Sequence, residues 1–185
     1  MRRVVIWNVM TLDGYFEGTA PWDLSFHNLV WGEELEAFSL QQGEELSTLL
    51  FGRKTYEGMA AYWTKETGAI ADMMNNSEKA VVSRTLKDVA WNNSRLLEGD
   101  VVEAVERLKR EPGKDIFVFG SAELVDTLLK NRLVDEYRLG IAPVVLGAGN
   151  PLFKASGDQL VMKLLKTTPL KTGGVVLHYQ PQYAA

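Results

Sequence analysis

The chain has 185 residues, a formal charge of −4 and hydrophobic residues at 46% of its positions, which is enough for one domain with a sizeable buried core. Charged residues make up 24% and aromatic residues 10%, so the composition excludes an intrinsically disordered chain. The acidic balance argues against a general nucleic-acid or membrane-surface binder. The absence of cysteine excludes disulfides, zinc–thiolate sites and thiol nucleophiles.

Nothing in the sequence directs the chain to a membrane or a metal. No apolar run has the length of a membrane span, and the first residues turn polar at Asn8, too early for a signal peptide. The two histidines are too few for a typical histidine-based metal site. We therefore expect a cytoplasmic protein that binds a small-molecule substrate, with no metal, nucleic acid or membrane.

The first two thirds of the chain alternate apolar strands with helices. Val4–Met10 is rich in β-branched residues and predicts a buried strand, which Asp13-Gly14 follows with a strong turn signal. The elements expected next are a helix over 29–40, a strand over 47–51, a helix over 53–62, a helix with a surface loop over 64–77, a strand over 79–83, a helix over 101–108, a strand over 115–119 and a helix after Gly120. This alternation predicts a mainly parallel sheet covered on both faces.

The last third of the sequence has a different pattern. Residues 135–145 are expected to be extended, and 159–168 and 172–180 predict two strands joined across Pro169. These two strands predict an antiparallel hairpin added at the edge of the sheet. Without repeats, low-complexity segments or linkers, the chain is expected to be a single α/β domain over residues 1–185.

The most informative feature is a strand that ends directly in a helix start with small or basic residues. At Gly52-Arg53-Lys54-Thr55 the helix start offers unpaired backbone N–H groups and the positive end of the helix dipole, which together bind anions. The basic side chains and the threonine hydroxyl add charge and hydrogen-bond donors. An ordinary helix start with solvated basic residues explains the same pattern, so both interpretations stay open here.

Two further strand ends have a related composition. Ser83-Arg84 follows the strand over 79–83 and suits an isolated phosphate, although Ser-Arg-Thr is also an ordinary polar turn. Gly120-Ser121-Ala122-Glu123 follows the strand over 115–119, and its small residues permit a close approach of backbone to ligand. The alternative for that segment is a helix N-cap by Ser121.

Parallel strands place all three of these ends at one edge of the sheet, where ligands bind in open α/β folds. A diphosphate at the first element and a separate phosphate at the second suit NADP better than NAD. The Gly-x-Gly-x-x-Gly and P-loop patterns are absent, so a classical dinucleotide fold and a nucleotide triphosphatase are both disfavoured. Of the five tryptophans, Trp22 is the one expected outside the core, because its loop is rich in glycine and proline.

Taken in order, these motifs resemble the dihydrofolate reductase-like superfamily. The branch that they resemble most is the reductase domain of the bifunctional riboflavin deaminase-reductase, the RibD C-terminal domain family. The segments that carry the resemblance are Met10–Phe16, Gly52–Glu57, Val82–Arg84, Ile116–Ser121, Leu133–Leu139, Pro143–Gly147 and Pro151–Phe153. They span essentially the whole chain.

The resemblance implies a three-layer fold with a mainly parallel mixed sheet flanked by helices, and NADPH as the hydride donor. It assigns the diphosphate to one helix start, the adenosine phosphate to a Ser-Arg pair, and the nicotinamide to the first strand and the glycine-containing turn. The cofactor residues implied in this way are Val9, Met10, Phe16, Gly52, Arg53, Lys54, Thr55, Ser83, Arg84, Gly120, Ser121, Ala122 and Glu123.

The sequence departs from the superfamily mainly on the substrate side. The usual Gly-Gly is Gly120-Ser121, and the carboxylate that anchors the pteridine in folate reductases is replaced by His27 and Asn28 near the corresponding place. Leu139 stands where a threonine usually supports that carboxylate. Folate reduction is therefore disfavoured. The chain also lacks the His-x-Glu and Pro-Cys-x-x-Cys motifs of a deaminase.

Our hypothesis from the sequence is an NADPH-dependent reductase of a small polar heterocycle, related to riboflavin biosynthesis. Asp13 is the first candidate for a catalytic or substrate-binding side chain or for ordering its loop, with a turn-capping role before Gly14 as its alternative, and Glu34 is a second acid candidate. Trp22 and His27 are the other candidate substrate residues. Two alternatives stay open: a folate reductase with a displaced carboxylate, and an NADPH-binding module without catalysis.

The resemblance also implies a homodimer. The apolar run over 141–146 and the C-terminal hairpin are the segments expected to form its interface.

Overall fold

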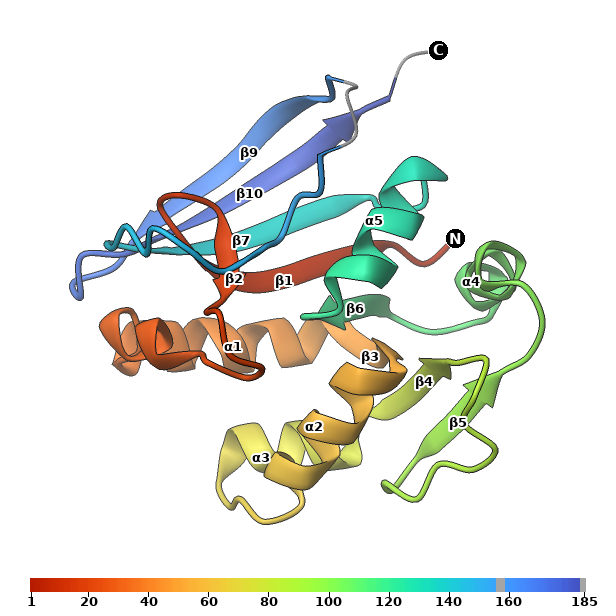
Figure 1. Cartoon of the computed structure of the whole chain (residues 1–185). Helices are drawn as coiled ribbons and strands as arrows, with labels where there is room; N and C mark the ends of the chain where they lie inside the picture. The colour runs from red at the N-terminus through yellow and green to blue at the C-terminus, as the bar shows by residue number, and fades with distance from the viewer. Residues whose placement is uncertain (156–158, 184–185) are drawn as a thin grey trace.

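The structure is a computed structural model that describes residues 1–155 and 159–183. Its centre is an eight-stranded sheet with the strand order β5-β4-β3-β6-β1-β7-β10-β9 (Figure 1). The strands are β1 (Val4–Thr11), β2 (Tyr15–Glu17), β3 (Leu46–Gly52), β4 (Glu78–Val82), β5 (Ser94–Leu97), β6 (Asp115–Phe119), β7 (Glu136–Ala142), β8 (Asn150–Pro151), β9 (Val161–Pro169) and β10 (Val175–Gln182). The helices are the 3₁₀ helix η1 (Ser25–Leu29), α1 (Glu33–Glu45), α2 (Arg53–Trp63), α3 (Ala69–Asn76), α4 (Val101–Arg110) and α5 (Ala122–Lys130).

The sheet is parallel from β5 to β7, and β10 and β9 join it antiparallel at the β7 side. The predicted α/β class, the mainly parallel sheet and the antiparallel hairpin at its edge are confirmed. Strands β2 and β8 form a separate antiparallel pair, which the sequence did not predict.

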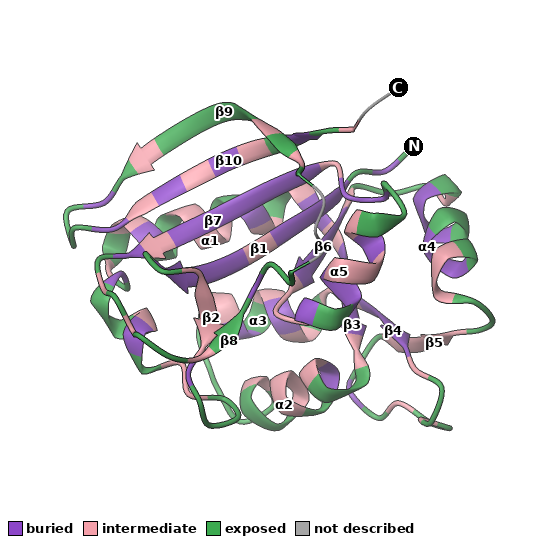
Figure 2. Ribbon diagram, turned by 45° about the horizontal axis from the view of Figure 1, so that its top comes forward, coloured by how far each residue is buried: buried purple, intermediate pink, exposed green. Residues whose placement is uncertain are grey.

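Both faces of the sheet are buried at its central strands β3, β6 and β1, and this explains why these strands have nearly continuous apolar sequences. On one face, alternate residues of β1 such as Ile6 and Met10 pack against α4 and α5. On the other face, Val5 and Val9 pack towards α1, α2, α3 and η1. Figure 2 shows the resulting band of buried residues along β1 and β7.

Several predicted boundaries and one predicted burial are wrong. The helix expected over 29–40 is α1, which begins only at Glu33 and continues to Glu45, because the chain is extended at Gly32; Leu29 belongs to the separate helix η1. The last two strands cover 161–169 and 175–182, displaced towards the C-terminus by one to three residues. Strand β5 was missed because it has only four half-buried residues at the sheet edge. Trp31, expected in the core, is 49% exposed. No helix in the described part of the chain is long and apolar enough to cross a bilayer.

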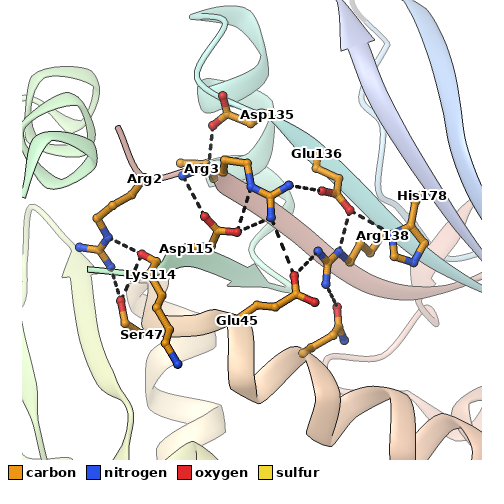
Figure 3. Close-up of polar contacts among 12 residues, drawn as sticks. Arg2, Arg3, Glu45, Ser47, Lys114, Asp115, Asp135, Glu136, Arg138 and His178 are labelled. Carbon is orange, nitrogen blue, oxygen red and sulfur yellow. Dashed lines mark hydrogen bonds and ion pairs between the residues drawn. The ribbon is translucent and has the colours of Figure 1, made fainter. Parts of the chain in front are cut away.

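A buried ionic cluster lies beneath α1 on the sheet (Figure 3). Glu136 is at its centre, with Arg138 Nε at 2.7 Å, Arg3 Nη1 at 2.9 Å and His178 Nδ1 at 3.0 Å. Arg138 also donates to Glu45 of α1 at 2.6 Å. Burial opposes ionisation of Glu136, but hydrogen bonds from His178 and Arg138 and the charges of the two arginines lower its pKa to about 2. The cluster therefore ties β1, β7, β10 and α1 together through charge.

Lys79 is a second buried charge, and it makes the stability depend on pH. Its Nζ donates to the carbonyls of Asn75 and Asn92 at 2.6 and 2.8 Å and lies 4.4 Å from the Trp91 ring centre. Burial lowers its pKa from 10.5 to about 8. The folded protein therefore loses this proton before the unfolded chain does, and we expect the free energy of unfolding to rise between about pH 8 and pH 10.5. Urea unfolding across this range should show the rise, and Lys79→Met should lack it; equal slopes would contradict the assignment.

Candidate functional site

The three strand ends singled out in the sequence lie side by side. Strands β4, β3 and β6 are neighbours and run parallel, so their carboxyl ends share one edge of the sheet. Gly52 pairs with Val82 in the register of β3 and β4, which brings the first and second elements together. The predicted convergence of the three ends is confirmed; their use in cofactor binding stays a prediction.

The first and third elements are in direct contact. The backbone N–H of Gly52 donates to Ser121 Oγ at 3.3 Å, so the start of α2 is tied to the start of α5. Gly120 has a φ of +63°, and a Cβ there would lie 3.3 Å from Thr55 Cγ2. Ser121 occupies the N-cap position of α5, as the alternative expected, but its side chain makes no capping hydrogen bond to that helix.

The charged residues at this edge differ in how they are engaged. Arg53 forms an exposed pair with Glu57 at 3.4 Å within α2. Lys54 and Arg84 are exposed and form no ion pair among the described residues. Glu123 at the start of α5 is 3.6 Å from Lys154 and is almost fully exposed. The edge thus offers unpaired positive side chains beside two helix starts.

Ser83 and Arg84 line a small cavity of about 140 Å³. The Ser83 hydroxyl already accepts the N–H groups of Thr85 and Leu86 at 3.1 and 3.0 Å, so it shapes its own turn. The rest of the lining is Val82, Leu97, Gly99 and Val101. Sequence reasoning missed the last three as lining residues, because Leu97 ends β5 and the other two follow it, and β5 was itself missed.

A larger hollow of about 430 Å³ lies at the opposite end of the strands, around Arg2 and Lys109. Its cations already have partners: Arg2 donates to Ser47 and to the Lys114 carbonyl, and Lys109 donates to Asp135 at 2.6 Å. We therefore take the edge formed by β4, β3 and β6 as the candidate functional site.

The predicted nicotinamide residues do not share one face of the sheet. Val9 is buried with Phe26 on the side of η1 and α1, whereas Met10 and Phe16 pack on the side of α5. This follows from the alternation of side chains along a strand. The structure therefore separates Val9 from the other two by the thickness of β1.

Asn8 is a residue of this region that the sequence analysis did not select. It is buried on β1, its Oδ1 accepts the Gly120 N–H at 2.9 Å, and its Nδ2 has no partner within the described residues. It is the first residue of β1 beyond the last pairing with β6, at Trp7. The sequence signal that could have identified Asn8 is a polar residue inside a strand that is otherwise apolar and buried.

Asp13 orders a loop. Its carboxylate accepts the Thr11 hydroxyl at 2.6 Å and the backbone N–H groups of Leu146 and Gly147 at 3.1 and 2.8 Å. The Thr11 hydrogen bond and these two amides lower its pKa to about 2. The structure therefore gives Asp13 the loop-ordering role, and its catalytic role stays a prediction.

The remaining substrate candidates lie around η1 and α1. Glu34 accepts the Lys171 N–H at 2.6 Å and so supports the turn between β9 and β10. His27 follows the buried Phe26 in η1, and burial lowers its pKa to about 4, so that its imidazole is neutral at pH 7. Its Nε2 is buried without a partner among the described residues. Of the two, His27 has a buried polar atom whose hydrogen bond is not made among the described residues.

Trp22 joins the loop before η1 to helix α2. It is 44% exposed and has a φ of +64°, and its backbone N–H donates to Glu17 Oε1 at 2.7 Å. A Cβ on Gly58 of α2 would lie 1.8 Å from Trp22 Cζ2, so the indole lies directly on this glycine. Trp22 thus connects the candidate substrate side to the helix that begins at Arg53.

Gly58→Ala tests this contact. In most helices the change stabilises by about 1 kcal/mol, but here the methyl group displaces Trp22, and we expect a loss of about 1–3 kcal/mol in the free energy of unfolding. In a Trp22→Ala background the same change should become stabilising. Denaturant unfolding of the four proteins of this cycle measures the effect, and a stabilising Gly58→Ala in the wild-type background would contradict the contact.

These residues fit a phosphorylated dinucleotide. Gly120 provides a surface without a Cβ beside Thr55, two helix starts meet at Gly52 and Ser121, and Arg84 stands unpaired at a separate cavity. Glycine at the close approach, backbone N–H groups and arginine are the groups that bind a diphosphate and an isolated phosphate in proteins.

Comparison with known proteins gives relatives over the full length. The model of the RibD C-terminal domain matches residues 2–176. The chain is 31% identical over 186 residues to the uncharacterized protein YyaP of Bacillus subtilis (strain 168), covering 96% of this chain and 94% of that protein. A putative riboflavin biosynthesis protein from Shewanella sp. PV-4 has a similar crystal structure, with a TM-score of 0.79, 20% identity and coverage of 99% and 100% of the two chains.

A second solved structure is similar over part of its length. It is a diaminohydroxyphosphoribosylaminopyrimidine deaminase/5-amino-6-(5-phosphoribosylamino)uracil reductase from Thermotoga maritima, with a TM-score of 0.67 and 12% identity. The match covers 98% of this chain and 57% of that one. At these identities, the two structures show a shared fold.

Proposed function

The chain belongs to the RibD C-terminal domain family, and we propose that it is an NADPH-dependent reductase of a small polar heterocycle, similar to 5-amino-6-(5-phosphoribosylamino)uracil reductase. The observation that carries the proposal is the meeting of three strand ends at one edge, with Gly120 against Thr55 and Arg84 unpaired beside them. Family membership supports a reductase-like role.

In this proposal each element binds one part of the cofactor. The starts of α2 and α5 hold the diphosphate, and Arg84 holds the adenosine phosphate in the cavity that Leu97 and Gly99 complete. Asn8 fixes the turn at Gly120, because its Oδ1 accepts the Gly120 backbone N–H. When bound, NADPH supplies a hydride, and the protein supplies orientation and charge stabilisation.

The substrate side is assigned by the groups that remain available. Asp13 and Glu34 are engaged by backbone N–H groups of distant loops, so we assign them structural roles. His27 is neutral at pH 7 and its buried Nε2 has no partner among the described residues; we propose that this nitrogen contacts the substrate once the substrate displaces the residues that cover it. The engagement of Glu34 also weakens the folate-reductase alternative with Glu34 as the displaced carboxylate.

The proposal is tested by following NADPH oxidation with aminopyrimidinones, dihydrofolate and quinones as acceptors. The proposal would be supported if the wild type turns over an aminopyrimidinone and the His27→Phe variant does so at a much lower rate. Turnover with dihydrofolate alone would favour a folate reductase. Tight NADPH binding without turnover of any acceptor would favour a non-catalytic binding module.

We also propose a homodimer formed through β9. This strand is at the edge of the sheet, and Val161, Leu164 and Leu165 are 59%, 50% and 48% exposed on it. The first part of the 141–146 run lies instead in β7, inside the sheet, so the proposed interface is the hairpin. Light scattering should give twice the chain mass for the wild type and a smaller mass for Leu164→Lys; a monomeric wild type would contradict the proposal.

A further inference from the structure

The part of the chain that forms the proposed substrate side carries no positive side chain. Residues 4–52 fold into β1, β2, η1, α1 and β3, and they include Trp22 and His27 (Figure 1). This segment contains no lysine or arginine. Its carboxylates are Asp13, Glu17, Asp23, Glu33, Glu34, Glu36, Glu44 and Glu45. The segment is therefore strongly negative, although the chain as a whole is only mildly acidic.

The lysines and arginines all lie within the described residues, and most of them belong to other parts of the fold. Seven precede β1, β6 or β7, at the end of the strands opposite to the candidate site: Arg2, Arg3, Lys109, Arg110, Lys114, Lys130 and Arg132. Six others lie past the end of α2, on β4, β5 and α4, or on the outer strand β9: Lys65, Lys79, Arg95, Arg107, Lys163 and Lys166. None of these elements contains a substrate candidate.

The remaining cations lie at the cofactor edge or are already paired. Five are near the starts of α2 and α5 or follow β4: Arg53, Lys54, Arg84, Lys87 and Lys154. Arg138 is 4% exposed, and Glu136 and Glu45 hold its guanidinium at 2.7 and 2.6 Å. Lys171, in the turn of the hairpin, is 3.7 Å from Glu34. On the side of His27, the described residues therefore include no unpaired cation.

The helices on this side do not suit a phosphate either. Proteins bind phosphates through arginine and lysine, or through the free N–H groups of a helix start. The first turn of α1 contains Glu33, Glu34 and Glu36, which complement the positive end of its dipole and repel a second anion. Helix η1 is a short 3₁₀ segment of five residues. A phosphate placed here would lose its hydration without gaining a counter-charge.

The groups that this side does offer suit an uncharged ring. Aromatic side chains gather there: the rings of Trp7 and Phe38 are 5.3 Å apart, and those of Phe26 and His27 are 5.0 Å apart. The imidazole of His27 is neutral at pH 7, and its Nε2 has no partner among the described residues. Apolar aromatic walls with a single neutral polar atom are typical of sites for planar, uncharged ligands.

We propose that the substrate is a heterocycle without a phosphate group, a free base or a nucleoside and not a nucleotide. The inference rests on the proposed function, because it concerns the acceptor of the same hydride. It separates this chain from the Thermotoga maritima reductase, whose name gives a phosphoribosyl compound as substrate. A shared fold does not require a shared substrate, since recognition depends on the side chains of the site.

The experiment compares two acceptors that differ only in the phosphate, with NADPH at saturation. They are 5-amino-6-(5-phosphoribosylamino)uracil and the same compound without its phosphate. We expect kcat/KM to be roughly tenfold or more higher for the unphosphorylated acceptor, because the dianion is repelled by the carboxylates of residues 4–52. Raising the salt from about 0.01 M to about 1 M shortens the Debye length from about 30 Å to about 3 Å, so the preference should become smaller.

A matched pair of variants tests whether charge beside His27 sets the preference. Asn28 is exposed and follows His27 in η1, so Asn28→Lys places a cation at the proposed substrate side. Gln41 is exposed in the second half of α1, and Gln41→Lys makes the same change of charge away from His27. Asn28→Lys should reduce the preference about fivefold and Gln41→Lys less than about twofold. Thermal unfolding verifies that both variants are folded.

The outcomes separate the inference from the function on which it rests. Equal kcat/KM for the two acceptors, or a higher value for the phosphorylated one, would overturn the inference and leave the reductase proposal intact. A preference that neither salt nor Asn28→Lys reduces would also overturn it, because charge would then not be its cause. A wild type that oxidises NADPH with neither acceptor would contradict the proposed function, and the inference with it.

Discussion

Glu136→Ala is expected to destabilise the protein by about 3–5 kcal/mol, because it leaves the buried Arg138 guanidinium without its buried counter-charge. Arg138 is only 4% exposed and would keep Glu45 and Gln42 as its remaining partners. His178 would lose its hydrogen bond to the carboxylate. Urea unfolding at neutral pH measures the loss.

Two further variants serve as controls for this prediction. The pair Glu103–Arg107 is exposed on α4 with 3.9 Å between the charged atoms, so Glu103→Ala should change the stability by less than about 0.5 kcal/mol. The double variant Glu136→Met/Arg138→Met removes both buried charges and should be clearly more stable than Glu136→Ala. A neutral Glu136→Ala, or a double variant that is less stable than the single one, would contradict the role of the cluster.

The low pKa of Glu136 gives this cluster a pH dependence. Its value of about 2 in the folded protein lies below the ordinary 4.5, so the stabilisation is complete above about pH 4.5 and is lost as the pH falls towards 2. The difference in the free energy of unfolding between wild type and Glu136→Gln should therefore become smaller as the pH falls from about 4.5 towards 2.

Arg84→Ala is expected to weaken NADPH binding by roughly ten- to a hundredfold and to leave NADH binding nearly unchanged, since a charge-assisted hydrogen bond to the 2′-phosphate is lost. Arg84 is exposed and forms no ion pair within the described residues, so folding stability should stay within about 0.5 kcal/mol of wild type. Calorimetry with both cofactors measures the change in preference.

Lys87→Ala is the matched control for Arg84→Ala. Lys87 is an exposed cation in the same loop, but it does not line the cavity that contains Arg84. Its removal should change NADPH affinity only slightly, through the general electrostatic field. Equal losses in the two variants would show that the preference comes from net charge and not from a phosphate site.

The strands that form the cofactor edge could be predicted because their sequences leave few alternatives. The segments at β3, β4 and β6 are buried on both faces, so each is a short apolar run that ends in glycine or serine. Since parallel strands align their carboxyl ends, the position of Gly52, Ser83 and Gly120 at one edge followed from the strand assignment, whereas the order β4-β3-β6 that makes them neighbours did not.

The parts that could not be predicted depend on contacts between distant residues. Glu136 and His178 meet only because β10 pairs with β7 in one particular register. No local sequence pattern predicts this register. The docking of Trp22 on Gly58 depends in the same way on where a loop crosses a helix. Ser121 read as a helix cap because serine is common there; its left-handed backbone redirects the hydroxyl to Gly52.

Titration of the wild-type protein with NADPH and with NADH, in parallel, tests the central claim most directly. The convergence of two helix starts with a separate arginine-lined cavity predicts binding of both through the diphosphate, and tighter binding of NADPH by roughly tenfold or more. Equal affinities for NADPH and NADH would contradict the proposal that Arg84 binds the adenosine phosphate. A protein that binds neither cofactor would contradict the assignment of a dinucleotide site at this edge, and with it the proposed reductase function.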